Sequence, residues 1–437
     1  MQKYGTQEPK AGNHVLEDDV TALVVPRFLR YVKVWTTSDR HIEETPSSPG
    51  QWELARLLVQ ELNGLGLGAE LTDHCYVIAR LPASPGLETK PVIGFLAHLD
   101  TAQDVSGKNV KPVLVENYDG EKIVLRSPGT AGVSDRADVV CLDPETDPGL
   151  AAHKGKAIIH TDGTTLLGAD DKAGIAEIMG AVEYLLSHPD IKHGPVEIIF
   201  SPDEETGKGL PCFPPDKLAA KVCYTLDGGA LGELEAECFN AWSAKVCFSG
   251  RVIHLGHARG TLANACLMAA SFAVMLPRSE SPEATDGYYG YYCPTEIKGG
   301  LENAELEVYI RDFDLARAKE RVEALDTFAA AVEAQFPGGS VTVEAQPQYY
   351  NIKEKIDGNP EVLSGLEEAA RRTGIEFTLK PIRGGTDGSK LTEMGIPTPN
   401  IFTGGRNFHS VTEWASVPDM AAACRLVVEL VKVWAEA

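Results

Sequence analysis

The sequence predicts an α/β protein: a three-layer α/β/α domain with a mostly parallel sheet, into which a smaller ferredoxin-like α+β domain is inserted. In the first half of the chain, apolar β-branched runs alternate with helical patterns, as in parallel sheets covered by helices. From about residue 239 the order of expected elements changes to β-α-β-β-α-β. A chain of 437 residues also exceeds the size at which one hydrophobic core usually stops growing. Two domains are therefore expected.

The elements of the first domain follow from the spacing of apolar residues. Strands are expected at residues 91–97, 196–200 and 222–226, where the apolar runs are continuous. Residues 174–186 carry apolar side chains at spacings of three and four, which predicts a helix. Residues 20–35 are apolar but interrupted by proline and basic residues, which predicts an amphipathic surface helix.

The inserted domain and the return to the first domain are read in the same way. We assign residues 1–238 and 351–437 to the first domain and 239–350 to the inserted one. Residues 127–152, rich in Pro, Gly and Asp, are expected to form a surface excursion. The further expected elements are strands at 244–248, 290–297, 304–310 and 340–345 and helices at 262–276, 315–336, 360–373 and 419–436.

Charge and composition exclude several classes of protein. The net charge of −23, with no Lys/Arg-rich tract, argues against a nucleic-acid partner. No apolar stretch is long enough for a membrane span, and the first twenty residues lack the pattern of a signal peptide. The nine cysteines form no Cys-x-x-Cys pair, which is typical of reduced thiols. We therefore expect a cytoplasmic protein.

Five short motifs place metal-type ligands directly after apolar runs or beside a helix start. Ligands at the carboxyl ends of parallel strands gather at one edge of a sheet. Crowded carboxylates raise the cost of ionising one another, so such a cluster requires cations. Two Zn²⁺-like ions would neutralise it and generate a hydrolytic water, which favours a binuclear metallopeptidase. The motifs are His98-Leu99-Asp100, Asp170-Asp171, Asp203-Glu204-Glu205, Asp227-Gly228-Gly229 and Phe408-His409.

Two of these motifs suggest separate roles for their neighbouring residues, although each motif also has an ordinary structural explanation. Residues two apart on a strand face the same side, so Asp100 could fix the tautomer of His98. The alternative is a surface histidine next to a turn. Of Glu204 and Glu205, one could bind metal while the other takes a proton from water. The alternative is a solvated pair of charges.

The other three motifs are ambiguous when taken singly. Asp170 and Asp171 precede a helix, so they also qualify as ordinary N-cap residues. Asp227 could be a turn aspartate before two glycines, and His409 a loop histidine without function. The neighbouring glycines and the tight apolar approach to Asp170 favour a carboxylate that bridges two metals.

Over about residues 22–437, several longer sequence stretches make the chain resemble the peptidase T, or aminotripeptidase, group of the M20 co-catalytic zinc peptidases. The long run from Thr161 to Gly174 and the loop from Arg383 to Gly388 are far more specific than a generic metal motif. The stretches that carry the resemblance are residues 98–101, 106–108, 115–118, 161–174, 202–205, 226–229, 311–314, 383–388 and 400–405.

The resemblance implies a ligand set for two Zn²⁺ ions per subunit, with Co²⁺ or Mn²⁺ as alternatives. His98 and Asp227 would hold one ion, Glu205 and His409 the other, and Asp170 would bridge them. A cis peptide bond is expected directly after the bridging aspartate. All five ligands of the pattern are present in this sequence.

The resemblance also implies roles around the metals. Glu204 would be the general base and later the proton donor, and Asp100 would orient His98. His254 matches a histidine of the inserted lid domain that is expected to stabilise the tetrahedral oxyanion. Residues expected to position the substrate are Arg311, Arg383 and Asn264.

The implied activity is removal of the N-terminal residue from tripeptides, through a metal-bridging water activated by Glu204. The substrate would be a short peptide, and relatives of this kind are often homodimers. The nearest alternative is a related M20 dipeptidase, carboxypeptidase or N-acyl-amino-acid deacylase. From other classes, the alternatives are a catalytically silent binding protein and a single-metal phosphoesterase using residues 384–388, although this loop lacks the strand-to-helix context of a phosphate loop.

The chain departs from the family pattern at several places. Leu255 follows His254 where the family usually has proline, which could alter the geometry of the lid. Residues 410–413 differ from the familiar sequence, which could alter the pocket for the amino end of the substrate. Residues 1–21 extend beyond the usual start of the family, and residues 127–152 differ in content.

Overall fold

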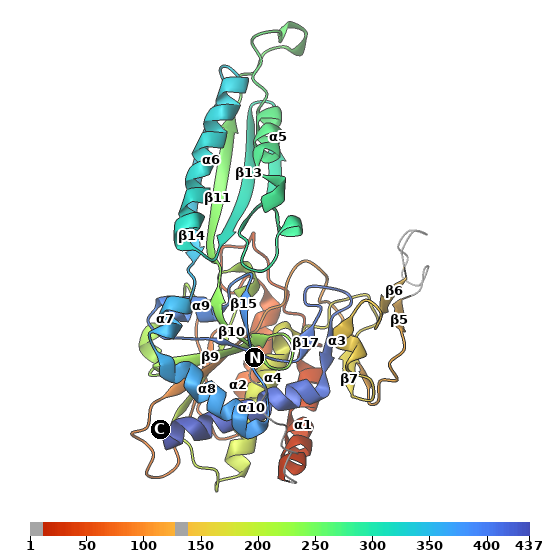
Figure 1. Ribbon diagram of the computed structural model, residues 1–437, viewed down its shortest axis with the longest axis vertical. Coiled ribbons are helices and arrows are strands. Elements are labelled where there is room, and N and C mark those ends of the chain that lie inside the picture. The colour runs from red at the N-terminus through yellow and green to blue at the C-terminus, as the bar shows by residue number, and fades with distance from the viewer. Residues whose placement is uncertain (1–11, 127–138) are drawn as a thin grey trace, which may run out of the picture. The chain divides into compact units, whose positions relative to one another are not determined.

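The computed structural model describes residues 12–126 and 139–437, which form two compact units (Figure 1). Unit 1 contains the described residues up to Ala236 together with Lys355–Lys380 and Thr386–Ala437. Unit 2 contains Glu237–Glu354 and Pro381–Gly385. The assignment of a catalytic role to residues 1–238 and 351–437 and of a lid role to 239–350 stays a prediction.

A large mixed sheet of eight strands forms the centre of unit 1, in the order β1-β2-β8-β3-β9-β16-β10-β15. The inner strands β8, β3, β9 and β16 run parallel, whereas β1, β2 and β10 pair antiparallel with their neighbours. The carboxyl ends of the parallel strands therefore lie at one edge. The strands are β1 (Glu70–Leu71), β2 (Val77–Leu81), β3 (Ile93–His98), β8 (Val196–Ser201), β9 (Val222–Gly228), β10 (Glu233–Cys238), β15 (Thr378–Ile382) and β16 (Asn400–Phe402).

Helices cover both faces of the large sheet. On one face α4 packs against β3 and β9 and against α1 and α10, and α10 packs against α8. On the other face Leu391 of α9 joins a buried cluster with Leu96, Ile199 and Cys223 from the inner strands. The helices are α1 (Gly12–Tyr31), α2 (Pro49–Gly64), α3 (Pro148–Ala151), α4 (Ala169–Ser187), α7 (Lys353–Asp357), α8 (Pro360–Thr373), α9 (Asp387–Glu393) and α10 (Val417–Glu436).

Two small antiparallel sheets complete unit 1. One has the strand order β17-β18-β7-β4, and the other consists of β5 and β6. Of the expected excursion at residues 127–152, residues 127–138 lie outside the described part, and the rest carries β6 and α3. The strands are β4 (Val113–Val115), β5 (Ile123–Arg126), β6 (Val140–Leu142), β7 (Ile158–His160), β17 (Gly405–Arg406) and β18 (Trp414–Ser416).

Unit 2 is an antiparallel sheet with two helices on one face. The strand order is β12-β13-β11-β14, and α5 and α6 run alongside β11 and β13 and contact each other (Figure 1). Every second residue of β13 is buried against the helices, as expected for a half-covered sheet. The elements are β11 (Asn240–Ser249), α5 (Ala265–Met275), β12 (Tyr291–Gly299), β13 (Asn303–Asp312), α6 (Leu315–Gln335) and β14 (Ser340–Tyr349).

The predicted fold class is confirmed, with two refinements. The large sheet is parallel only at its centre, since β1, β2 and β10 pair antiparallel with their neighbours. The helix expected at residues 20–35 spans Gly12–Tyr31, and it is amphipathic as predicted: Val20, Val24 and Phe28 have no exposed area, whereas Ala22, Pro26 and Arg30 are exposed. No described helix has the length and apolar character that a membrane crossing requires.

Candidate metal centre

Five predicted ligands converge where the inner strands of unit 1 end. His98 is the last residue of β3, and Asp227 lies near the end of the neighbouring β9. Glu205 follows β8, Asp170 stands at the start of α4, and His409 follows β17. This is the edge of an α/β sheet at which ligand sites usually lie.

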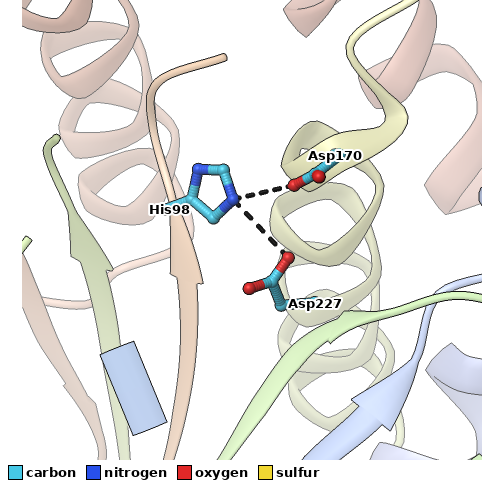
Figure 2. A group of neighbouring side chains, drawn as sticks. All are labelled: His98, Asp170 and Asp227. Carbon is cyan, nitrogen blue, oxygen red and sulfur yellow. Dashed lines mark hydrogen bonds and ion pairs between the residues drawn. The ribbon is translucent and has the colours of Figure 1, made fainter. Parts of the chain in front are cut away.

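The first group of ligands is His98, Asp170 and Asp227. The Nε2 atom of His98 lies 2.9 Å from Oδ1 of Asp170 and 3.5 Å from Oδ1 of Asp227. Figure 2 shows the imidazole directed at both carboxylates. One ligand atom from each residue lies within 4.8 Å of the others, a spacing that one metal ion could bridge.

The second group shares Asp170 with the first. Nε2 of His409 lies 3.0 Å from Oε2 of Glu205 and 3.3 Å from Oδ2 of Asp170. Asp170 thus turns one carboxylate oxygen toward His98 and the other toward His409. A carboxylate in this position can bridge two cations.

The start of α4 is shaped to present Asp170 to both histidines. The peptide bond between Asp170 and Asp171 is cis, which confirms the expectation from the sequence. Gly174 allows α4 to approach β9 closely, because an added Cβ would lie only 1.9 Å from the carbonyl oxygen of Leu226. Leu226 immediately precedes Asp227, so this contact brings the two carboxylates of the first group together.

Glu413 anchors the turn before the bridging aspartate. Its buried carboxylate accepts hydrogen bonds from the backbone N–H groups of Leu167 at 2.7 Å, Gly168 at 2.8 Å and Asp170 at 3.1 Å. The sequence marked residues 410–413 only as a departure near the expected amino-end pocket. The side chain of Glu413 instead faces inward. In the sequence, the feature that could have pointed to this residue was its position directly before the apolar residues of β18.

Asp100 contacts both halves of the site. Its Oδ1 lies 3.4 Å from Nδ1 of His98, within ion-pair distance. The same carboxylate accepts the backbone N–H groups of Glu204 at 3.0 Å and Glu205 at 3.2 Å. Its expected role in orienting His98 stays a prediction, and the bonds to the glutamate turn add a second role that the sequence did not suggest.

The second histidine has an acidic neighbour as well. Oδ2 of Asp104 lies 3.2 Å from Nδ1 of His409. Unlike Asp100, Asp104 is largely exposed, so water weakens this ion pair. Asp104 could not be identified from the sequence, since a single aspartate in a loop carries no distinguishing pattern.

Crowding and burial shift the pKa values of the acidic residues in the centre. Burial raises the pKa of Glu204 well above its ordinary value, and the negative charge of Asp227 adds to the shift. Burial, with the charge of Asp170, raises the pKa values of Glu205 and Asp227 to about 7. Burial also acts to raise the pKa of Asp170, but hydrogen bonds to the two histidines outweigh it and lower that pKa.

The pKa values of the two histidines are also raised, against the effect of burial. Burial opposes the charged form of His98, yet the carboxylates of Asp227 and Asp170 raise its pKa well above the ordinary value. Hydrogen bonds with Asp170 and Glu205 raise the pKa of His409 to about 12 against the same opposing effect of burial. The acids therefore attract positive charge strongly, which is the property expected of a cation site.

The donor set fits a pair of divalent cations. Each group offers one imidazole nitrogen and two carboxylates, which are ligands that Zn²⁺ accepts. Oε1 of Glu205 is buried and has no hydrogen-bond partner among the described residues, so its lone pairs are available to an ion. Glu204 belongs to neither group.

His254 and Asn264, two of the residues expected to contact substrate, lie in unit 2. Nδ1 of His254 accepts the backbone N–H of Gly256 at 3.2 Å. Asn264 is the N-cap of α5, where its side-chain oxygen accepts the N–H groups of Cys266 and Leu267. Each bond has a local structural purpose, and the substrate-binding roles stay predictions.

Arg311 is engaged within the sheet of unit 2. Its Nη1 donates to the carbonyl oxygens of Trp242 and Ile310, both at 3.0 Å. Its guanidinium also lies over the rings of Tyr309 and Tyr349. Binding of a substrate carboxylate by Arg311 stays a prediction.

Arg383 holds its own loop to the rest of unit 2. Its Nη1 donates to the carbonyl oxygens of Gly287 at 2.8 Å and Tyr289 at 2.9 Å, and its Nη2 donates to Oγ1 of Thr285 at 2.9 Å. The guanidinium lies 5.1 Å from the ring centre of Phe239. Its predicted contact with substrate is likewise untested by these bonds.

Comparisons with known proteins place the chain among peptidases. A sequence model of the family described as "Peptidase family M20/M25/M40" matches residues 137–433. The chain is 46% identical to Peptidase T of Geobacillus sp. (strain WCH70) over 412 residues, covering 94% of this chain and 98% of the relative. It is also 46% identical to Peptidase T of Bacillus licheniformis over 414 residues, with the same coverage.

Solved structures share the fold. An aminopeptidase PepT from Bacillus cereus ATCC 10987 has a TM-score of 0.71 at 23% identity and covers 95% of this chain and 99% of its own. A tripeptidase from Staphylococcus aureus has a TM-score of 0.71 at 21% identity, with the same coverage. A dinuclear metal-binding M20 peptidase of Bacillus subtilis has a TM-score of 0.62 at 14% identity and covers 96% of this chain and 99% of its own.

Proposed function

The chain belongs to the M20/M25/M40 peptidase family, and from this premise we propose that it is a tripeptide aminopeptidase that works with two Zn²⁺ ions. The observation that carries the proposal is the position of Asp170 between two histidine–carboxylate groups. Relatives named Peptidase T that span nearly the whole chain support a tripeptide substrate.

The ligand assignment is part of the proposal. His98 and Asp227 would hold one ion, Glu205 and His409 would hold the other, and Asp170 would contact both. When bound, such ions polarise a carbonyl group and lower the pKa of a water molecule. Co²⁺ and Mn²⁺ are alternatives that the same nitrogen and oxygen donors accept.

Glu204 is the residue proposed to move protons. It directly precedes Glu205, belongs to neither ligand group, and lines the same small pocket as His98 and Asp227. In this position its carboxylate would accept the proton of the attacking water and later donate it to the leaving amine nitrogen. Asp100 would hold the backbone of Glu204 in place through the bond to its N–H group.

Unit 2 is proposed to act as a lid that contributes substrate contacts. His254 would stabilise the oxyanion, and the residues proposed to position the peptide are Arg311, Arg383 and Asn264. A guanidinium can bind a peptide carboxylate with two hydrogen bonds. Leu255, where the family usually has proline, is the residue through which the lid would differ from that of relatives.

Two further properties of the protein are proposed. None of the nine cysteines, all of which lie in the described part of the chain, forms a disulfide, which supports a reducing compartment such as the cytoplasm. A homodimer is proposed from the resemblance to related enzymes. Neither property enters the chemistry of the centre.

The test is the initial rate of release of the N-terminal amino acid by the zinc- or cobalt-loaded protein. One residue series is offered as dipeptide, tripeptide, tetrapeptide and N-acetylated tripeptide. We expect the free tripeptide to be cleaved fastest, and we expect a chelator or Glu204→Gln to abolish cleavage. Glu367→Gln, which changes an exposed glutamate of α8, is the matched control.

Other outcomes would redirect the proposal. Faster cleavage of the dipeptide or of the acetylated tripeptide would indicate a dipeptidase or deacylase activity at the same metal centre. Cleavage of none of the four, with both metal ions bound, would indicate a binding protein that keeps the fold.

A further inference from the structure

The turn that carries Glu204 and Glu205 is held by a segment far away in the sequence. Residues 37–51, the strap, lead into the first turn of α2. The carboxylate of Asp203 accepts hydrogen bonds from the strap at three points: the N–H of Ser47 at 2.8 Å, the hydroxyl of Ser47 at 2.5 Å, and Nε2 of Gln51 at 2.7 Å. In return, the N–H of Asp203 donates to Oε1 of Gln51 at 3.0 Å.

The strap also holds the far end of this turn. Nζ of Lys208 donates to the carbonyl oxygens of Ile42 at 2.7 Å and Arg40 at 3.3 Å. The turn itself is closed by a bond from the N–H of Lys208 to the carbonyl oxygen of Asp203 at 3.1 Å. The strap therefore fixes the residues on both sides of Glu204 and Glu205.

The backbone at Asp203 shows why this support matters. Asp203 has a φ of 55°, in the left-handed region that residues other than glycine rarely adopt. Its side chain is completely buried, and its backbone and carboxylate are bonded to the same glutamine. The direction in which the chain enters Glu204 is thus set by contacts with Gln51 and Ser47.

We propose that Gln51 and Ser47 are positioning residues for the general base: acting through Asp203, they hold the carboxylate of Glu204 at its working position. The proposal rests on the assignment of Glu204 as the base. A catalytic group misplaced by about 1 Å can lose about 100-fold in rate. Neither Gln51 nor Ser47 belongs to a metal-ligand group, and Glu205 keeps its contacts with His409 and Asp100 when they are lost, so their loss is expected to affect catalysis without removing metal.

The experiment compares the same substitution at two positions of one helix. Gln51→Leu removes the bonds to Asp203, whereas Gln60→Leu changes an exposed glutamine of α2. We expect Gln51→Leu to lower kcat for a tripeptide by about 10- to 100-fold, with KM and the two bound metal ions per chain unchanged. Gln60→Leu is expected to keep kcat within about twofold of the original protein.

A second pair of variants tests the direct contact with Asp203. Gln51→Glu places two carboxylates together, and it is expected to reduce kcat at least as much as Gln51→Leu. Combining Gln51→Glu with Asp203→Asn restores a donor–acceptor match. The double variant is expected to have a kcat at least tenfold higher than Gln51→Glu alone. If Gln51 had a purely structural role, the variants would melt at a lower temperature. Their kcat, measured at temperatures well below melting, would then be unchanged.

The outcomes separate this inference from the proposed function. Equal kcat values for Gln51→Leu and Gln60→Leu, with Glu204→Gln inactive, would overturn the positioning role alone. A loss of activity that follows loss of bound metal would also overturn it. Full activity of Glu204→Gln would overturn the assignment of the base itself.

Discussion

The carboxylate of Glu413 accepts the backbone N–H of Asp170 at 3.1 Å, across a separation of 243 residues in the chain. It also accepts the N–H groups of Leu167 and Gly168 in the same turn. Asp170 is the residue that both ligand groups share. A residue that contacts no proposed metal ion therefore fixes the position of the carboxylate between the two sites.

Glu413→Gln is expected to weaken metal binding at both sites. The amide offers one acceptor oxygen in place of two, so at least one buried N–H loses its partner, at about 1–3 kcal/mol. Competition with a chelating dye, analysed for two ions per chain, measures the effect. We expect lower affinity for both ions, because Asp170 serves both.

The control for this prediction is Glu367→Gln, which removes the same charge from an exposed position on α8. It is expected to leave both affinities unchanged. Weaker binding of only one ion by Glu413→Gln would contradict the role of Asp170 as the shared ligand.

The location of the candidate metal centre could be predicted because most of its proposed ligands stand directly beside a recognisable pattern in the sequence. Each of β3, β8 and β9 is a continuous apolar run that ends beside a ligand, and parallel strands bring such ends together. The two-unit layout also followed from a change in element order. Of the inner strands, β3, β8 and β9 were predicted from their apolar runs, whereas β16 was not.

The supporting contacts could not be predicted, because each joins residues far apart in the chain. Gln51 and Asp203 are 152 residues apart, and neither stands in a recognisable pattern. For Arg311, the family resemblance implied a role in substrate binding, which stays a prediction, and its bonds to two backbone carbonyl groups were not indicated by the sequence. Periodicity identifies buried faces and gives no information on polar partners.

Gly174→Ala is expected to damage both stability and metal binding. The new methyl group would meet the carbonyl oxygen of Leu226, a backbone atom that cannot move aside without shifting β9. We expect a loss of about 1–3 kcal/mol or more, together with weaker binding at the site formed by Asp170 and Asp227. Thermal melting and the chelating-dye titration measure the two effects.

Gly64→Ala is the matched control, since it lies at the end of α2 and an added Cβ would meet nothing within 4 Å. Alanine in a helix is favoured over glycine by about 0.5–1 kcal/mol, so this variant should be slightly more stable. If Gly174→Ala melted at the same temperature as Gly64→Ala, the close approach of α4 and β9 would not constrain the fold.

Removal of metal is expected to lower the melting temperature of the protein. Without cations, the carboxylates of the two ligand groups repel one another, and ligand linkage contributes about 2.7 kcal/mol at a metal concentration 100 times the Kd. Addition of EDTA should lower the midpoint, and excess Zn²⁺ should restore it.

Asp170→Asn should make the melting temperature nearly independent of both reagents, because it removes the shared ligand. Asp190→Asn, at an exposed position, should respond as the original protein does. An unchanged midpoint after dialysis of the original protein against EDTA, with metal shown to be gone, would argue against cation binding at this centre.

Glu235 is not a proposed metal ligand, and its ionisation makes the stability of the protein depend on pH. It lies opposite Asn400 where β10 pairs with β16, and Nδ2 of Asn400 donates to its carboxylate at 2.7 Å. Asn400 in turn accepts the backbone N–H of Asp227 at 3.1 Å. Burial, reinforced by the charge of Glu233, raises the pKa of Glu235 from 4.5 to about 7.

A carboxyl group whose pKa is raised by folding holds its proton more tightly in the folded state. The stability that it contributes is therefore fully present below about pH 4.5 and is lost as the pH rises through about 7. Glu235→Gln keeps an acceptor for Asn400 but cannot ionise. We expect this variant to be closest in stability to the original protein at pH 5 and to exceed its free energy of unfolding by about 1–2 kcal/mol at pH 8, after allowance for partial exposure. Melting curves of both proteins from pH 5 to pH 8 measure the difference, and a difference that stays constant over this range would show that Glu235 does not change its protonation on folding.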